Sequence, residues 1–328
     1  LAFAMLASLP PVTGLYTALI PVLIYMVMGT SRYLSQGSFP VVCMMIAEVV
    51  EREVLKVNGF EPTLHNNATN TSNPTPTPLG SLWSPLENKK LEIAVSLALL
   101  IGLMQVAMGL FKLGFIATYL SDPVISGFTT GSAVVVVLSQ VKHILGLEIP
   151  QITGIFSVVK MTASMLAKIA SSNVGSVITG LLCLAVLIGL KYLNDRYHNK
   201  LPFPIPAELI VIVVSTAISY GGKINARFEV QIVEIIPKGL PPISIPSFTL
   251  MNDIVVDAFK IAIVIFATNI SLAKLFAKKN RQKIDSNQEL IAYGACNVGV
   301  SFISGFPVCT ALARVVVQES LAHTQVRS

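Results

Sequence analysis

The sequence predicts an all-α, multi-pass membrane protein. Of its 328 residues, 53% are hydrophobic and only 12% are charged, whereas about 25% of the residues of an average soluble domain are charged. Several apolar runs approach the roughly 20 residues with which a helix crosses a bilayer. Helices are the expected spanning elements, because they satisfy their own backbone hydrogen bonds in lipid.

The apolar runs give the expected helices in chain order. Residues 1–9 form the end of a first helix, which Pro10-Pro11 terminates. Further spans are expected at about 15–28, 39–57, 91–110, 124–145, 174–192, 207–220, 254–276 and 290–303, with a last helix from 310 onward.

Two of these helices begin at a Gly/Pro break. The tripeptide Phe-Pro-Val occurs at 39–41, after Gly37, and again at 306–308, after Gly305. Such breaks in distant parts of a membrane chain indicate a transport site, because each helix that begins there directs unpaired N–H groups and the positive end of its dipole inward. Anions are attracted to such ends. A chance repeat of three residues would give the same pattern.

The polar segment 58–90 is predicted to be an extracellular, glycosylated loop. It contains sequons at Asn67 and Asn70 and a Thr/Pro tract. With this loop outside, counting the crossings places the basic stretches 191–200 and 277–283 inside, as the positive-inside rule requires. The two interrupted helices then enter from opposite sides, so their N-termini can face each other near the midplane.

Charge and cysteine usage argue against other classes. The net charge of +6 is spread over short loops and does not form one patch, so no nucleic-acid partner is expected. The cysteines lack CxxC spacing and are interpreted as small core residues. No catalytic triad or metal-ligand spacing is found, and the sequence predicts no enzyme, no metal and no cofactor.

Several short motifs occur along the chain in a recognisable order. They include Leu9-Pro10-Pro11-Val12, Gly29-Thr30-Ser31-Arg32, Pro123-Val124-Ile125-Ser126-Gly127, Pro204-Ile205-Pro206 and Asp285-Ser286-Asn287-Gln288-Glu289. Together they resemble the SulP anion transporters, solute carrier family 26, over almost the whole chain. Residues 270–274 and 317–320 favour the animal branch that includes prestin and the chloride, bicarbonate, sulfate and oxalate exchangers.

The resemblance implies part of a fold with seven plus seven inverted-repeat helices, arranged as a core and a gate, with half-helices 3 and 10. On that pattern residues 1–320 are a transmembrane transporter domain truncated at both ends, residues 321–328 are a tail, and the STAS domain is absent. The apolar start at Leu1 also favours a fragment or a splice form.

The same resemblance assigns an anion site to the two half-helix ends. Arg314 would supply the positive charge, since a guanidinium in the membrane needs a cavity or a partner; pairing with an acid such as Glu289 is the alternative. Phe39 and Phe3 match aromatic residues that line the pocket, although each also fits ordinary packing. The expected anion-binding residues are Phe3, Phe39, Pro40, Val41, Leu312, Ala313 and Arg314.

The implied function is secondary active transport of small inorganic or organic anions, with chloride exchanged for bicarbonate, sulfate or oxalate by alternating access. Thr268 stands where proton-coupled relatives carry Glu, which favours exchange over proton symport. A prestin-like motor or anion channel, and a non-transporting truncated isoform that associates with full-length subunits, remain alternatives. Expected partners are the lipid bilayer and, in the full-length form, a second subunit of a homodimer; the expected location is the plasma membrane.

Overall fold

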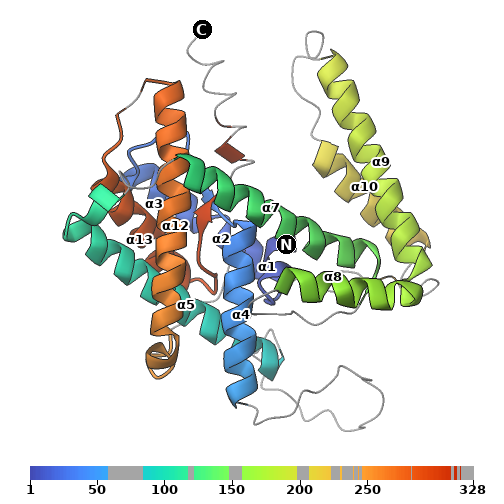
Figure 1. Ribbon diagram of the computed structural model, residues 1–328, viewed down its shortest axis with the longest axis horizontal. Helices are drawn as coiled ribbons and strands as arrows, with labels where there is room; N and C mark the ends of the chain where they lie inside the picture. Colours follow the sequence, from blue (N-terminus) through green and yellow to red (C-terminus); the bar gives the residue numbers. More distant parts are fainter. Residues whose placement is uncertain are drawn as a thin grey trace. The chain divides into compact units, whose positions relative to one another are not determined.

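The computed structural model describes most of the chain, and the described parts are almost entirely helical (Figure 1). They comprise residues 1–57, 84–116, 122–147, 157–197, 207–222, 246–281 and 283–311, with single positions at 230, 239, 243, 314, 315 and 318. The chain divides into two compact units, Leu1–Ser132 with Ile235–Ser328, and Ala133–Glu234.

The first unit brings together elements from both ends of the chain. Its helices are α1 (Ala2–Leu6), α2 (Thr13–Thr17), α3 (Ile20–Met28), α4 (Pro40–Val57), α5 (Pro85–Leu110), α12 (Met251–Lys279) and α13 (Ser286–Ser301), with the 3-10 turn η1 (Leu113–Phe115) and the short strands β1 (Gln36–Gly37) and β2 (Cys309–Thr310). Helix α7 (Asp122–Ile144) passes from this unit into the second.

Helices α5 and α13 approach each other closely because glycines face each other across the contact. A Cβ atom on Gly102 would lie 2.8 Å from the Gly294 carbonyl oxygen, and one on Gly294 would lie 2.6 Å from Val106 Cγ2. Small residues allow this backbone approach between membrane helices, where packing is a main source of association energy. The α5–α13 pair is therefore a rigid base for the residues that α13 presents.

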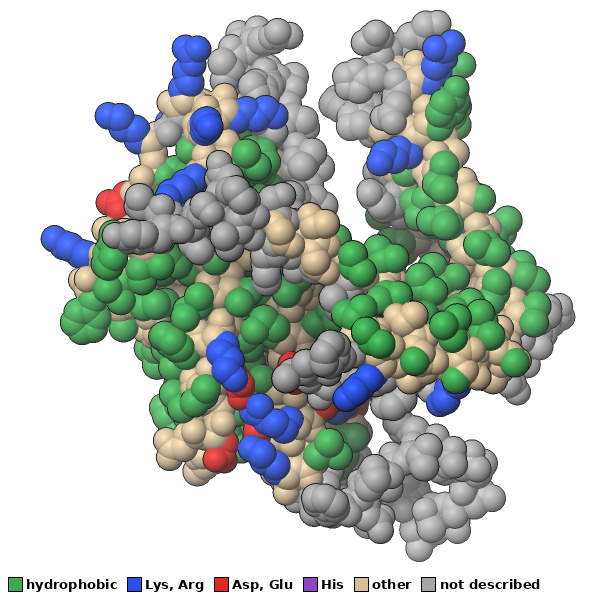
Figure 2. Space-filling view, in the orientation of Figure 1, with side chains coloured by type: hydrophobic (Ala, Val, Ile, Leu, Met, Phe, Trp, Pro, Cys, Tyr) green, Lys and Arg blue, Asp and Glu red, His purple; other side chains and the backbone are tan. Residues whose placement is uncertain are grey.

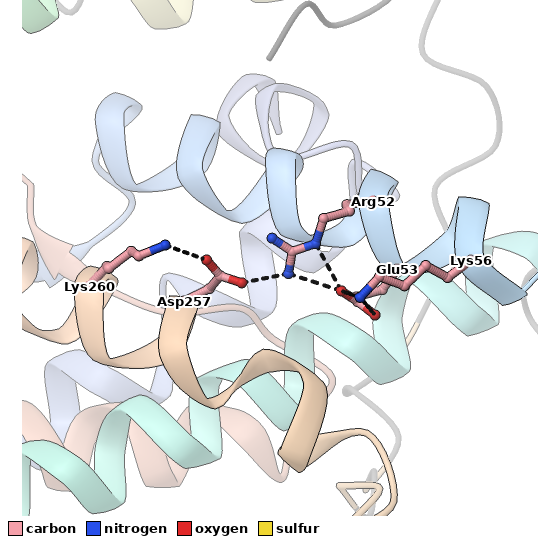
Figure 3. A network of polar contacts seen from close by, with 5 residues as sticks. All are labelled: Arg52, Glu53, Lys56, Asp257 and Lys260. Atoms are coloured by element: carbon pink, nitrogen blue, oxygen red, sulfur yellow. Dashed lines mark hydrogen bonds and ion pairs between the residues drawn. The ribbon is translucent and has the colours of Figure 1, made fainter. Parts of the chain in front are cut away.

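An ion network joins α4 to α12 (Figure 3). Arg52 Nη2 contacts Asp257 Oδ2 at 2.5 Å and Glu53 Oε1 at 2.9 Å. Lys56 bonds the buried Glu53 carboxylate at 2.8 Å, and Lys260 bonds Asp257 at 3.2 Å. The carboxyl-terminal end of α4 and the beginning of α12 are thus held together.

The second unit contains α8 (Ser157–Lys168), the turn η2 (Ile169–Ser171), α9 (Val174–Tyr197) and α10 (Ala207–Gly222). The apolar span Val174–Asn194 of α9 has no buried residue along its most apolar stretch. Hydrophobic side chains cover much of the visible face of the molecule (Figure 2). An exposed hydrophobic surface of this kind is typical of helices that are surrounded by lipid.

The expected spans up to residue 303 are confirmed as helices, with three differences in detail, and most of the last helix expected from 310 onward lies outside the described residues. The polar loop expected at 58–90 is too long, because α5 begins at Pro85, where Ser84 and Glu87 form a capping box. Within the described residues, α5, α9 and α12 are long and apolar enough to cross a membrane. The span expected at 15–28 is present but interrupted: α2 ends at Thr17 and α3 begins at Ile20. Pro21, in the first turn of α3, cannot continue an incoming helix but fits a new start. Helix α8 was not expected, because its 12 residues form no continuous apolar run.

Candidate functional site: two helix starts joined by a short β-pairing

The two Gly/Pro breaks meet directly. Strands β1 and β2 pair antiparallel, with Gln36 opposite Thr310 and Gly37 opposite Cys309. The Ala311 N–H extends this pairing by donating to the Ser35 carbonyl at 2.9 Å. Segments more than 270 residues apart in sequence therefore lie side by side, each immediately before a helix start.

The first helix start is built by Phe39 and Pro40. Pro40 is the first residue of α4, where its missing N–H costs no hydrogen bond, and the Phe39 carbonyl accepts from the Cys43 N–H at 3.0 Å. The Phe39 side chain is 7% exposed and belongs to the same buried cluster as Phe306 and Cys309. Val41, half-buried, lies in the first turn and packs against that cluster.

The second helix start follows β2. The Ala311 carbonyl accepts from the N–H groups of Arg314 and Val315 at 3.0 and 3.1 Å. Arg314 Nη1 donates to two carbonyl oxygens, that of Ala18 at 3.3 Å and that of Gln36 at 3.4 Å. The guanidinium therefore spans from the second helix start to the strand that precedes the first. Leu312 and Ala313 lie outside the described residues.

Arg314 has no acidic partner within the described part of the chain, where every ion pair joins other residues. The alternative pairing with Glu289 does not form. The fully buried Glu289 carboxylate instead accepts from the Tyr25 hydroxyl at 2.8 Å, from the Thr30 N–H and hydroxyl at 2.7 and 2.6 Å, and from the Ser31 N–H at 3.1 Å. Among the described residues, the positive charge of Arg314 therefore has carbonyl contacts and no neutralising carboxylate.

Three buried side chains hold the extended segment 306–310. They are Thr17 of α2, Asn297 of α13 and Asn269 of α12, and each binds one backbone N–H of an alternate residue. Thr17 Oγ1 accepts from Phe306 at 3.2 Å, Asn297 Oδ1 from Val308 at 2.8 Å and Asn269 Oδ1 from Thr310 at 2.7 Å. Sequence reasoning missed these residues, although an Asn inside an apolar run is a signal that could have found them.

The other predicted residues are placed as follows. Phe3 is 40% exposed on α1, and the buried cluster takes Ala4 and Leu6 from that helix. Asn67 and Asn70 lie outside the described residues. Thr268 Oγ1 bonds the Val264 carbonyl of its own helix at 2.8 Å.

Metal-ligating side chains do not gather at this site. Across the described ranges, no group of three or more His, Cys, Asp or Glu residues could hold a metal ion. Three of the four cysteines, Cys43, Cys296 and Cys309, are buried and Cys183 is half-buried; all four are free thiols.

Comparison with known proteins identifies the family. Residues 1–328 match the sulfate permease family over their whole length. The chain belongs to this family. Its members are anion transporters and not enzymes, so the SulP resemblance of the motifs is confirmed, as is integration in a membrane.

Similar proteins include prestin and sulfate transporters. The chain is 41% identical to prestin of Danio rerio, covering 99% of the chain and 43% of that protein. It is 39% identical to sulfate anion transporter 1 of Homo sapiens, covering 100% of the chain and 47% of that protein. The chain thus spans less than half the length of these relatives.

Solved structures give the same fold. Murine Solute Carrier 26 family member A9, an anion transporter solved in the inward-facing state, superposes with a TM-score of 0.83 at 34% identity, covering 97% of this chain and 50% of that one. The transmembrane domain of the cyanobacterial bicarbonate transporter BicA superposes with a TM-score of 0.72 at 20% identity, covering 97% of this chain and 72% of that one. The fold class expected from the sequence, an all-α multi-pass membrane protein, is confirmed.

Proposed function

We propose that this protein is a secondary active transporter that exchanges chloride with bicarbonate, sulfate or oxalate by alternating access. The observation that carries the proposal is Arg314, a cation without a carboxylate partner in the described chain, located where the two helix starts meet. Family membership and the names of the sulfate-transporting relatives support the same substrate class.

The physical basis is electrostatic. The first turn of each helix has N–H groups without helical partners, and the helix dipole places positive potential there. An anion that loses its hydration can exchange water for these donors, for the guanidinium of Arg314 and for the positive edge of the Phe39 ring. The proposed contact residues are Phe3, Phe39, Pro40, Val41, Leu312, Ala313 and Arg314.

Alternating access requires that the site move relative to another part of the protein. All proposed contact residues belong to the first compact unit, Leu1–Ser132 with Ile235–Ser328. We assign this unit to the transporter core and Ala133–Glu234 to part of the gate. The pairing of β1 with β2 supports an inverted repeat, because each strand precedes a helix start in its own half.

The remaining assignments complete this proposal. Residues 1–320 form the transmembrane domain and 321–328 a tail. The loop between α4 and α5 is extracellular and carries glycans on Asn67 and Asn70. The protein resides in the plasma membrane and functions as a homodimer in its full-length form.

Uptake of radiolabelled sulfate and chloride into proteoliposomes tests the function. Uptake is expected to require an exchangeable anion inside the vesicle. Arg314→Ala is expected to lower uptake at least about tenfold, the consequence of losing roughly 1.4 kcal/mol of anion binding. Arg196→Ala, at the end of α9 in the second unit, is the matched control and should retain uptake. Undiminished flux in a protein carrying both Arg314→Ala and Phe39→Ala would reject the site.

A motor or channel activity is a second candidate, favoured by the 41% identity to prestin of Danio rerio. Voltage-clamp recording separates the two. Obligatory exchange gives flux that stops without a counter-anion, whereas a channel gives current without one. A motor gives voltage-dependent charge movement.

A further inference from the structure

We propose that Asn297 and Asn269, assisted by Thr17, are positioning residues that set the anion affinity of the transporter by fixing the start of its second half-helix. This inference rests on the proposed function. None of the three was expected at the site from sequence, and all are fully buried. Each acts through the backbone of segment 306–311 and not through a charge.

The first step is the backbone accounting of this segment. Non-helical backbone at membrane depth must find hydrogen-bond partners within the protein. On one edge, Cys309 faces Gly37 in the strand pair and the Ala311 N–H bonds Ser35. On the other edge, the N–H groups at 306, 308 and 310 bond the three side chains. Pro307 has no N–H and therefore needs no acceptor. The segment is thus held along both edges by these hydrogen bonds.

Asn297 binds its target as a neighbouring strand would. Its Oδ1 accepts from the Val308 N–H at 2.8 Å, and its Nδ2 lies 3.5 Å from the Val308 carbonyl. The Nδ2 group also donates to Gln105 Oε1 at 3.0 Å and to the Tyr293 carbonyl at 3.1 Å. Gln105 Nε2 in turn donates to the carbonyl oxygen of Ala262 in α12 at 3.3 Å. The position of Val308 is therefore fixed by the closely packed α5–α13 pair and by α12.

Asn269 acts at the last residues before the helix. Its Oδ1 accepts from the Thr310 N–H at 2.7 Å and from the Cys309 thiol at 3.0 Å. Thr310 precedes Ala311, whose carbonyl accepts the first helical hydrogen bonds, from the N–H groups of Arg314 and Val315. Any displacement of Thr310 is therefore passed to the guanidinium and to the first N–H groups of the helix.

Loss of either amide oxygen leaves a buried N–H without a partner. The segment can lower its free energy by moving so that this N–H finds another acceptor. The fraction of molecules with the helix start in its binding position then falls, and the apparent anion affinity falls by the same factor. A purely structural role has a different signature. It lowers the amount of folded protein, and therefore the maximal rate, without changing the half-saturating concentration of anion.

Sulfate-uptake kinetics in proteoliposomes, normalised to folded protein, test the inference. Asn297→Ala and Asn269→Leu are expected to raise the half-saturating sulfate concentration roughly tenfold, as about 1.4 kcal/mol of positioning energy predicts. Asn173→Ala is the matched control. Its Oδ1 also accepts a backbone N–H, that of Ser176 at 3.1 Å, but in the second unit. This control should stay within about twofold of the wild type.

Thr17→Val keeps the test decisive if the Asn variants fail to fold. It preserves side-chain shape and removes only the hydroxyl that bonds Phe306 and Thr13. A raised half-saturating concentration in this variant supports the inference. Wild-type half-saturation in every folded variant, with only the maximal rate lowered, overturns it. Absence of anion-dependent uptake in the wild type would instead reject the proposed function.

Discussion

At the scale of single residues, polar side chains in an apolar environment decide the local structure. Glu289 illustrates this, because its buried carboxylate receives four donors from the chain around the end of α3 and has no ion-pair partner in the described residues. The donors include two backbone N–H groups of the turn at Thr30 and Ser31. Glu289 therefore joins the start of α13 to the loop that leads into β1.

This arrangement predicts a graded response to substitution. Glu289→Ala would leave four donors without an acceptor, on the buried Tyr25 and Ser31 and on the half-buried Thr30, and should lower the free energy of unfolding by about 3 kcal/mol. In Glu289→Gln the amide oxygen can keep the three bonds from Thr30 and Ser31, and its NH₂ can donate to the Tyr25 hydroxyl, so the loss should be about 1 kcal/mol. Thermal unfolding in detergent measures both. Equal destabilisation by the two substitutions would show that these bonds do not hold the loop.

The sequence predicted only part of the site at this scale. Arg314 and Phe39 were recognised because a guanidinium or an aromatic ring close to a Gly/Pro break can be identified from the sequence alone. Asn269 and Asn297 were not, since each binds a backbone N–H at least 11 residues away, and such a contact depends on how three helices pack. The alternative role of Arg314, pairing with Glu289, was excluded only by the bonds that Glu289 makes.

At the scale of elements, hydropathy sufficed for the long helices but not for the breaks between them. Helices α5, α9 and α12 each contain a long apolar run that is visible in the sequence. The interruption between α2 and α3 and the existence of α8 depend on local backbone chemistry and on amphipathic packing, which a hydropathy window averages out. Close helix approach is likewise hidden in a sequence with many glycines.

The α5–α13 contact yields a prediction for Gly294→Ala. The new Cβ would lie 2.7 Å from the Gly102 carbonyl oxygen, a backbone atom that cannot turn aside, so the helices must separate. Overpacking of this kind costs about 1–3 kcal/mol of unfolding free energy. Gly189→Ala on α9, where nothing lies within 4 Å, is the matched control and should be neutral or slightly stabilising. Thermal unfolding of both variants tests this prediction. Equal midpoint temperatures for Gly294→Ala and Gly189→Ala would contradict close packing at Gly294.

At the scale of the whole molecule, the contact between α4 and α12 bears on membrane orientation. The sequon loop follows Val57 at the end of α4, and that end is bonded through Arg52 to Asp257 near the start of α12. With 29 residues, α12 is about 44 Å long, enough to cross the hydrocarbon core and reach the opposite headgroups. Its far end at Lys279 is therefore expected on the side of the membrane opposite the sequon loop, in agreement with the positive-inside rule.

Thiol labelling with a membrane-impermeant reagent tests this orientation in intact cells. In a Cys183→Ser background, which leaves three buried cysteines, Gly80→Cys should react in intact cells, because the loop is proposed to be outside. Lys279→Cys should react only after the membrane is permeabilised, because the basic end of α12 stays with the cytoplasm. Labelling of both positions from the same side would contradict the crossing of α12 and, with it, entry of the two half-helices from opposite faces. Labelling from opposite sides would support the crossing of α12 and entry of the two half-helices from opposite faces of the membrane.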